Sequence, residues 1–447
     1  MGRTVIIEEC VENYISSLYG SHKWQIGLIV GQLSSQRDYI LHLARTPDQS
    51  GNSDGSGETA ALDDIENRWI IEHAHQVSRM LTGGLDVIGV FAFGPMDMLT
   101  KSQAKIRQLL FSIQKTVQQK SASYFDDLIH SRILLQICSE TKKITCRTID
   151  VSDQRATPNP AEVKYQSFSP KWIKLETSLS LTNGCFDVPR KLKTSSLHKQ
   201  IMGSIHKKLQ SLSSALCTVN GELYADDQTL VSGGKSGRSS QASSKSTQTF
   251  KIDLFTDEPC STIESVEVET AASISISGSM SCRAYMHQKA TAGEAVQALK
   301  YDAIRSFLAR CEVLCEDVMD NQEEKPNSER SSTWTSPQRV FVPLGSGPVT
   351  VCDYVFKDET LKESKERIAE LLGIEPKEED FECSEEFPDV QTVGSLVEEM
   401  ETEDNEEITE SEEIQQGLGR RVIGAVVGVV VAVVAAGVTF LWGENTG

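Results

Sequence analysis

The sequence predicts a mixed α/β protein with a single transmembrane helix near its C-terminus. Between residues 11 and 357, short apolar runs typical of strands alternate with helical patterns, which favours helices packed on sheets. The 21 residues Val422–Trp442 then form an apolar run without a charged side chain. At about 1.5 Å per residue, a helix of this length crosses a hydrocarbon core of about 30 Å.

The net charge of −20 is concentrated in one segment of the 447 residues. Residues 378–416 contain 17 Asp and Glu but no Lys or Arg, so the rest of the chain is close to neutral. Nucleic acid is therefore excluded as the main partner, because its binding depends on Lys and Arg. The N-terminal residues lack the apolar run of a signal peptide, and eleven scattered cysteines favour a cytosolic body with reduced thiols.

Residues 1–151 are expected to form the first domain. Its strands are predicted from short apolar runs and its helices from apolar residues three or four apart. The expected elements are a helix around residues 11–18, strands at 25–32 and 39–45, a helix at 65–81, a buried strand at 85–93, a helix around 106–117, and a hairpin of strands at 133–138 and 144–151.

Residues 152–230 are expected to extend this domain with a strand at 172–181 and an amphipathic helix from Leu197 to Leu216. The Ser- and Gly-rich residues 231–249 predict a disordered insertion.

Residues 250–357 predict a second α/β unit. Its expected elements are strands at 250–255, 265–269 and 273–277, a long helix opened by the capping box Thr291-x-x-Glu294, and a hairpin of 339–344 with 349–356. Residues 358–419 should form a flexible acidic tether, with a short helix at 358–372.

The apolar run 422–442 is interpreted as a membrane anchor rather than a buried core helix or strand. Arg420 and Arg421 precede it, so the positive-inside rule predicts a cytosolic N-terminal body on a single-pass tail anchor. Gly424 and Gly428 have the spacing of a helix-packing motif, so dimerisation stays an open alternative. The residues expected to define the anchor are Val422, Gly424, Gly428, Leu441 and Trp442.

Two residue pairs could in principle bind a metal. His73 and His75 form the sequence's His-x-His, but residues two apart on a helix point in different directions and cannot share an ion. Cys311 and Cys315 lie on one helix face without a second pair to complete four ligands. We interpret His73 as a core or boundary histidine and the cysteines as packing residues, so no cofactor is expected.

The order of elements from Val11 to Val151 resembles an MPN domain, the fold of zinc-dependent isopeptidases that cleave ubiquitin-like modifiers. In catalytic members, a buried strand ends in His-x-His-Pro and is followed at fixed spacing by Ser and Asp. Here Ala92 and Gly94 stand at the histidine positions, Ser102 is retained, and Lys105 replaces the Asp. The resemblance therefore implies a metal-free pseudo-enzyme domain.

A second resemblance covers most of residues 1–357. The chain is similar to the odorant-response-abnormal protein four family through the segments Met1–Thr4, Gly31–Tyr39, Glu72–Leu81, Lys142–Thr148, Cys282–Tyr285, Ala295–Ala298 and Arg339–Pro343. It implies a membrane-anchored accessory factor of the endoplasmic reticulum that acts in the maturation and trafficking of seven-helix chemoreceptors. It also implies association with a cysteine protease specific for a ubiquitin-fold modifier.

The sequence thus leads to a non-catalytic adaptor whose partners are that protease, the chemoreceptors and the lipid bilayer. Two alternatives stay open at this point. One is a metal-independent hydrolase with an unrecognised site, and the other is a receptor-specific chaperone that acts through its transmembrane span.

Overall fold

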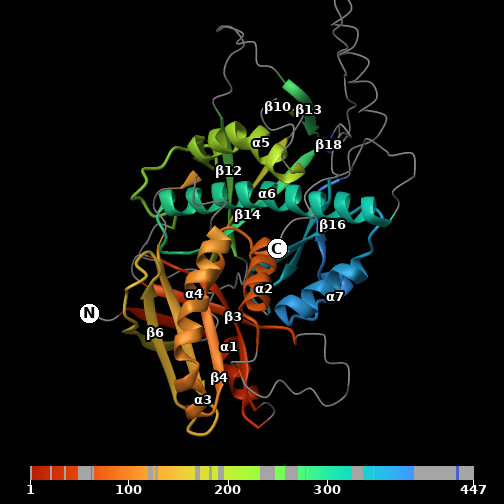
Figure 1. The fold of residues 1–447 in the computed structure, drawn as a ribbon. Coiled ribbons are helices and arrows are strands. Elements are labelled where there is room, and N and C mark those ends of the chain that lie inside the picture. Colours follow the sequence, from red (N-terminus) through yellow and green to blue (C-terminus); the bar gives the residue numbers. More distant parts are fainter. Residues whose placement is uncertain are drawn as a thin grey trace, which may run out of the picture.

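A computed structural model of the protein confirms the mixed α/β fold (Figure 1). The described residues contain seven helices and four sheets. The described residues are 3–20, 23–34, 37–48, 62, 65–118, 124–125, 129–166, 172–180, 184–189, 196–231, 247–256, 270–276, 278–324, 336–345, 347–386 and 429–431.

An eight-stranded sheet forms the first half of the fold, in the order β7-β6-β5-β4-β2-β3-β1-β8. Strand β4 pairs in parallel with β5, and β1 pairs in parallel with both β3 and β8, while the other neighbours are antiparallel. The strands are β1 (Thr4–Glu8), β2 (Gln25–Gln32), β3 (Arg37–Arg45), β4 (Asp86–Gly94), β5 (Ser131–Cys138), β6 (Ile144–Asp150), β7 (Asn159–Pro160) and β8 (Glu162–Gln166).

Helices cover both faces of this sheet. Helix α1 (Glu9–Leu18) packs on one face, and α2 (Asn67–Met80) and α4 (Gln103–Gln118) pack on the other, with α3 (Met96–Lys101) between β4 and α4. Because successive strand side chains point to opposite faces, Phe91 joins the core under α1 whereas Val90 joins the core under α2 and α4. Burial on both faces explains why β4 is almost continuously apolar.

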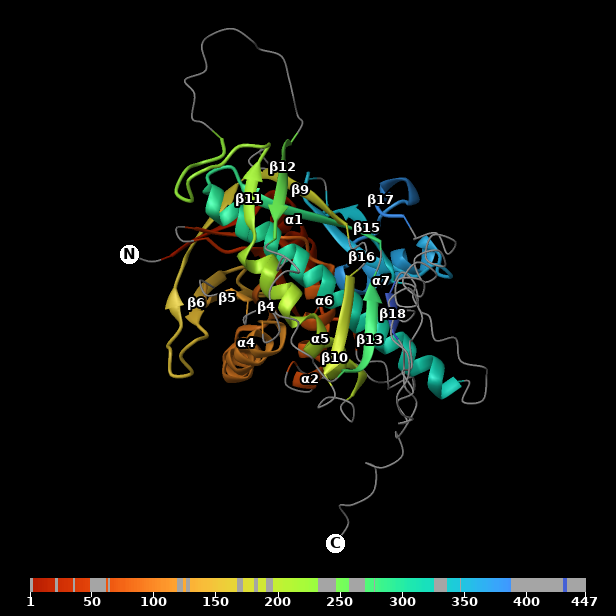
Figure 2. The same cartoon turned by 90° about the horizontal axis from the view of Figure 1, so that it is seen from above.

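The second half is built around the 33-residue helix α6 (Ala292–Glu324), which lies beside α5 (Leu197–Ser214) in two views (Figures 1 and 2). The predicted capping box opens α6, since the Thr291 amide donates to Glu294 Oε2 at 2.9 Å and the Glu294 amide donates to Thr291 Oγ1 at 3.2 Å. A four-stranded sheet packs against α6 in the order β11 (Leu216–Val219), β12 (Gln248–Phe255), β9 (Trp172–Ser180), β14 (Ser279–His287).

Two smaller sheets complete the fold. One has the order β16 (Thr350–Val355), β15 (Gln338–Pro343), β17 (Glu382–Cys383). Between β16 and β17 the chain forms α7 (Leu361–Leu372) and a short 3-10 turn at Glu378–Asp380. The other has the order β10 (Gly184–Pro189), β13 (Thr270–Ile276), β18 (Val429–Val431).

Several strands differ from the prediction. β1, β8, β10, β11 and β14 were not predicted, and the helix expected to reach Leu216 ends at Ser214. Leu216 instead begins strand β11 and is 73% exposed, so it does not continue the apolar face of α5. The strand expected at 265–269 and most of the insertion expected at 231–249 lie outside the described residues, although β12 already begins at Gln248.

The first part of the acidic tether expected over 358–419 is folded, and residues 387–419 lie outside the described part. Helix α7 packs against β3, β16 and α2, and the chain then returns to the body, where Glu385 is 5% exposed. Both Glu385 carboxylate oxygens accept hydrogen bonds from Arg310 Nη2, at 2.6 and 2.7 Å. Glu382 and Glu385 therefore belong to the folded body, where Arg283 and Arg310 neutralise their charges.

Of the predicted anchor, the structure describes Val429–Val431, which form β18 against β13, and the remaining residues of 422–442 lie outside the described part. Among the helices of the described residues, none has an apolar stretch long enough to cross a bilayer. The transmembrane helix stays a prediction.

A continuous seam joins the two halves. The Gly83 amide donates to the Arg283 carbonyl and the Tyr285 amide donates to the Gly83 carbonyl, both at 2.8 Å, so the segment after α2 pairs with β14. A Cβ on Gly83 would lie 2.4 Å from the Ala298 carbonyl oxygen, which explains the glycine. Arg305 of α6 donates to the carbonyls of Leu81, Thr82 and Leu85 at 2.6–3.1 Å.

Asp302 is the buried charge at the centre of this seam. It is fully buried, accepts the Arg283 amide at 2.8 Å and forms a bidentate pair with Arg339 at 2.7 and 2.9 Å. Burial alone would lower the pKa of Arg339, but the charge and hydrogen bonds of Asp302, together with Cys352 and Tyr354, raise that pKa above its usual value. One carboxylate thus connects α6, β14 and β15.

We expect Asp302→Ala to lower the free energy of unfolding by about 3–5 kcal/mol, because it leaves the Arg339 guanidinium buried without its counter-charge. Urea titration of the full chain measures the change. Lys362→Ala is the matched control, since the Lys362–Glu366 pair is exposed and should contribute less than about 1 kcal/mol. Equal losses for the two variants would contradict this role of Asp302.

Candidate functional site

The residues at the expected zinc-ligand positions lie where the sequence spacing placed them, at the end of β4. Ala92 and Gly94 are both buried in its last three residues. The Ser139 amide donates to the Gly94 carbonyl at 2.9 Å, which fixes this strand end against β5. A Cβ at Gly94 would lie 3.3 Å from both Met98 Sδ and Trp24 Cβ, so a larger side chain there requires these neighbours to move.

Ser102 and Lys105 follow at the joint between α3 and α4. Ser102 is 1% exposed, and its Oγ has no hydrogen-bond partner among the described residues. Lys105 Nζ donates to the carbonyls of Leu62 and Ile65, at 3.2 and 2.5 Å. The residue at the Asp position is therefore a cation that binds the chain just before α2, and it would repel a metal ion.

A small cavity adjoins this region. Its volume is about 70 Å³, room for a few water molecules but not for a polypeptide substrate. Ile65 lines it and also accepts the Lys105 hydrogen bond, while Asp48 lies at the same cavity and pairs with Arg45 at 2.7 and 2.8 Å. Among the described residues, no group of three His, Cys, Asp or Glu side chains is placed to hold a metal.

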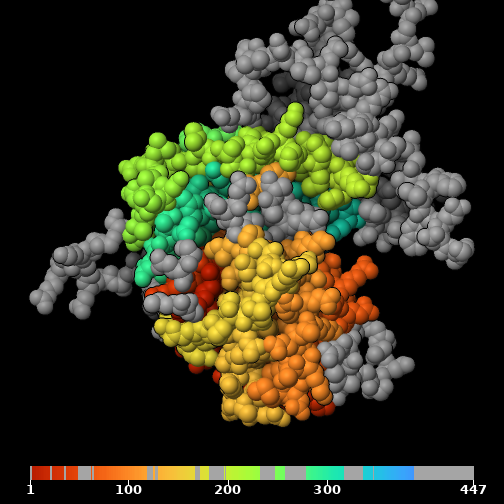
Figure 3. Space-filling model, turned by 60° about the vertical axis from the view of Figure 1, so that its left-hand side comes forward, coloured from red at the N-terminus to blue at the C-terminus, as the bar shows by residue number. Residues whose placement is uncertain are grey.

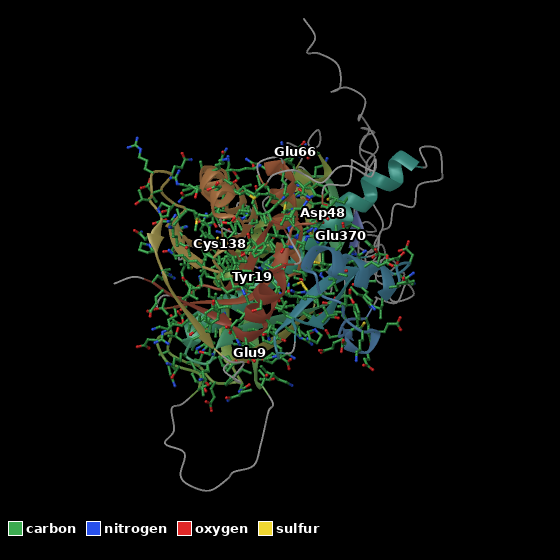
Figure 4. The ribbon with its side chains drawn as sticks, turned by 90° about the horizontal axis from the view of Figure 1, so that it is seen from below. Glu9, Tyr19, Asp48, Glu66, Cys138 and Glu370 are labelled. Carbon is green, nitrogen blue, oxygen red and sulfur yellow. The ribbon has the colours of Figure 1, made fainter. Side chains whose placement is uncertain are left out.

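Cys138 is the nucleophilic side chain next to this strand end, since it pairs with Gly94 in the sheet register. Hydrogen bonding from Thr141 lowers the pKa of its thiol. Cys138 is nevertheless only 1% exposed, close to Tyr19, whose ring packs edge-on against Phe93 at 5.5 Å between centroids (Figure 4). Cysteines buried in this way act in packing, because a substrate cannot reach the sulfur.

The two histidines of α2 point to different neighbours, as the helix geometry predicts. His73 is 4% exposed and its Nε2 lies 2.8 Å from the Leu371 carbonyl at the end of α7. His75 Nε2 instead faces Glu312 of α6 at 3.4 Å. His73 is thus the boundary histidine that we expected.

Cys311 and Cys315 are both buried in the core under α5 and α6 and form no disulfide. Burial raises the pKa of the Cys311 thiol well above its usual range, which keeps it protonated. The packing role predicted for this pair fits that environment.

Comparisons with known proteins give the family. The sequence profile described as "Odorant response abnormal 4-like" matches residues 27–383. The chain belongs to this family. The protein odr-4 homolog of Mus musculus is 34% identical over 98% of this chain and 99% of its own length. Odorant response abnormal protein 4 of Caenorhabditis elegans is 20% identical over 78% of this chain and 72% of its own length.

Among solved structures, the crystal structure of UfSP from C. elegans aligns with 83% of this chain and 57% of that chain. The sequence identity is 8% and the TM-score is 0.39, which is too low to carry an argument about fold or partner. The family resemblance predicted from the sequence segments is therefore confirmed, and the MPN-like fold stays a proposal.

The end of α7 generates a pH prediction. His42 Nε2 lies 2.6 Å from the Leu372 carbonyl, so two histidines contact the last carbonyls of this helix. Burial lowers the pKa of His73 to about 4 and also lowers the pKa of His42. Below the usual histidine pKa of 6.5, the unfolded chain binds protons that the folded chain does not. The free energy of unfolding therefore decreases as the pH is lowered.

We expect the free energy of unfolding to decrease between pH 7 and pH 4, with His73 contributing on the order of 3 kcal/mol to the decrease. His73→Gln should flatten this dependence, as followed by urea titrations across the pH range. His130→Gln at an exposed position is the control and should leave the slope as in the wild type. A slope insensitive to His73→Gln would contradict the assignment.

Proposed function

We propose that this chain is a non-catalytic adaptor anchored by residues 422–442 in the endoplasmic reticulum membrane, with its folded body in the cytosol. It supports the maturation and trafficking of seven-helix chemoreceptors and recruits a cysteine protease specific for a ubiquitin-fold modifier. Membership of the odorant response abnormal 4-like family carries this proposal, because relatives are matched over nearly the whole chain.

The local chemistry at β4 supports a role without catalysis. If residues 1–151 form an MPN-like domain, the zinc positions hold the non-ligating residues Ala92 and Gly94 and the cation Lys105. Zinc in such sites needs side chains that donate electron pairs, and neither an alanine methyl nor a glycine supplies one. The domain is then a scaffold for binding rather than an isopeptidase.

Anchoring gives such an adaptor its physical effect. A partner bound to a membrane-held body is confined to a thin layer at the bilayer surface, which raises its effective concentration for membrane substrates. The 33 residues from 387 to 419 between the folded body and Arg420 are rich in acidic side chains, whose mutual repulsion favours an extended spacer.

Metal and activity measurements distinguish the adaptor from a hydrolase. We expect less than about 0.1 zinc per purified full-length chain, because Lys105 replaces a ligand. Plasma mass spectrometry measures the zinc, and modifier conjugates serve as substrates. Lys105→Asp restores one ligand type only and should also remain zinc-free. Stoichiometric zinc, or turnover by the chain alone, would favour the hydrolase instead.

Purification from membranes tests the partner assignment. The full-length tagged chain should co-purify with the modifier-specific protease, and it should do so equally well when residues 422–442 are replaced by an unrelated tail anchor. The exchange should also preserve receptor delivery to the cell surface, since the body rather than the span carries the adaptor function.

Failure of the protease to co-purify at micromolar concentration would count against recruitment. Loss of receptor delivery in the anchor exchange, with protease binding intact, would favour a chaperone that reads receptor helices through its own span.

A further inference from the structure

A larger cavity lies along the seam, away from the end of β4. Its volume is about 550 Å³, within the range of pockets that hold small molecules. The β2–β3 hairpin, the segment before β5, the end of β14 and the first turns of α6 form its walls. In the space-filling view the green residues of α5 and its neighbours lie above the orange and yellow residues of the first half (Figure 3).

One wall of the cavity is rigid because its polar groups are already paired. Gln32 Nε2 donates to the carbonyls of Gly84 and Tyr285, at 3.0 and 2.9 Å, and Gln32 Oε1 accepts the His287 amide at 3.1 Å. The rings of Tyr39 and His287 stack beside it, with centroids 4.7 Å apart. These residues shape the cavity without offering a free charge.

Arg132, in contrast, is a charged residue of the cavity wall whose hydrogen-bonding groups are not all paired. Its side chain lines the cavity and is only 3% exposed. Nη1 donates to the carbonyls of Ile129 and Ser131, at 2.6 and 3.1 Å, but Nε has no hydrogen-bond partner among the described residues. Nη2 lies 4.0 Å from Asp86 Oδ2, at the outer limit of an ion pair.

Burying a guanidinium whose hydrogen-bond donors are not all paired lowers the stability of the folded state. Desolvation by burial lowers the pKa of Arg132, and Asp86 only partly opposes this effect. The nearby Arg3–Asp38 pair is already closed by hydrogen bonds of 2.5 and 2.8 Å, so Asp38 is engaged elsewhere. Nε is itself buried, so Nη2, with Asp86 Oδ2 4.0 Å away, is the nitrogen left to pair with a carboxylate in the cavity.

We propose that this cavity binds a small organic carboxylate with an apolar or aromatic body, whose carboxylate pairs with the Arg132 guanidinium at Nη2. The walls suit such a body. Phe125 and Tyr301 pack together with ring centroids 5.4 Å apart, and Ala290 and Ala298 add small apolar surface. Exposed Arg37 and Lys289 also line the cavity and favour the approach of an anion.

The same cavity disfavours a phosphate. The start of α6 lies in its wall, but the first amides of this helix are already used. Those of Ala292 and Gly293 donate to the carbonyls of Gln228 and Asp226, and the capping box uses those of Thr291 and Glu294. The Glu294 carboxylate lines the cavity as well and would repel a dianion. A monoanion paired with one arginine fits this charge distribution better.

Calorimetry on the full-length chain in lipid nanodiscs tests the proposal, with 1-naphthoate and its neutral counterpart 1-naphthamide as probes and empty nanodiscs subtracted. We expect saturable binding of 1-naphthoate and at least about tenfold weaker binding of 1-naphthamide, a ratio typical of losing one charged hydrogen-bonded pair. Arg132→Gln should weaken naphthoate binding by a similar factor, whereas Arg155→Gln, at an exposed position outside the cavity, should not.

Ala298→Phe fills the cavity and leaves Arg132 in place, so it should abolish naphthoate binding even if Arg132→Gln fails to fold. Thermal unfolding establishes which variants are folded. Equal affinity for the two probes, unchanged naphthoate binding in folded Arg132→Gln or Ala298→Phe, or no saturable binding of naphthoate by the wild type would overturn the proposal.

Discussion

The fold depends on one buried carboxylate at the contact between its halves. Asp302 connects α6 to β14 through the Arg283 amide and to β15 through the Arg339 guanidinium, while Arg305 on the same helix binds the carbonyls after α2. Charges removed from water are tolerated only when they are paired and hydrogen-bonded, so these side chains allow little choice in how the halves meet. The large cavity lies along the same seam, between the β2–β3 hairpin and the first turns of α6.

Much of the fold could be predicted because its signals are local. Strand β2 spans Gln25–Gln32 as expected, and the capping box at Thr291 opens α6. The elements that were predicted wrongly or missed are those whose residues pair with residues distant in the sequence. β14 was missed because Ser281 and Arg283 interrupt its apolar pattern, yet Arg283 pairs with Glu382 about a hundred residues later. Glu382 in turn looks like part of a solvated acidic spacer until its arginine partner is known.

The candidate site shows the same division. The apolar pattern of β4 placed Ala92 and Gly94 at the strand end, and their side chains alone indicated that they are not ligands. It did not reveal that Lys105 binds two carbonyls before α2, or that Arg132 lines a cavity with an incompletely paired guanidinium, because both depend on how separate segments meet.

Attachment to a bilayer is the claim on which the proposed adaptor role depends most directly. Extraction of isolated membranes with alkaline carbonate, followed by protease treatment of sealed vesicles, measures attachment and orientation together. The account predicts that the full-length chain stays in the pellet and that added protease degrades its body from the cytosolic side. Release of the intact chain into the carbonate supernatant, or protection of the body inside the vesicles, would contradict it.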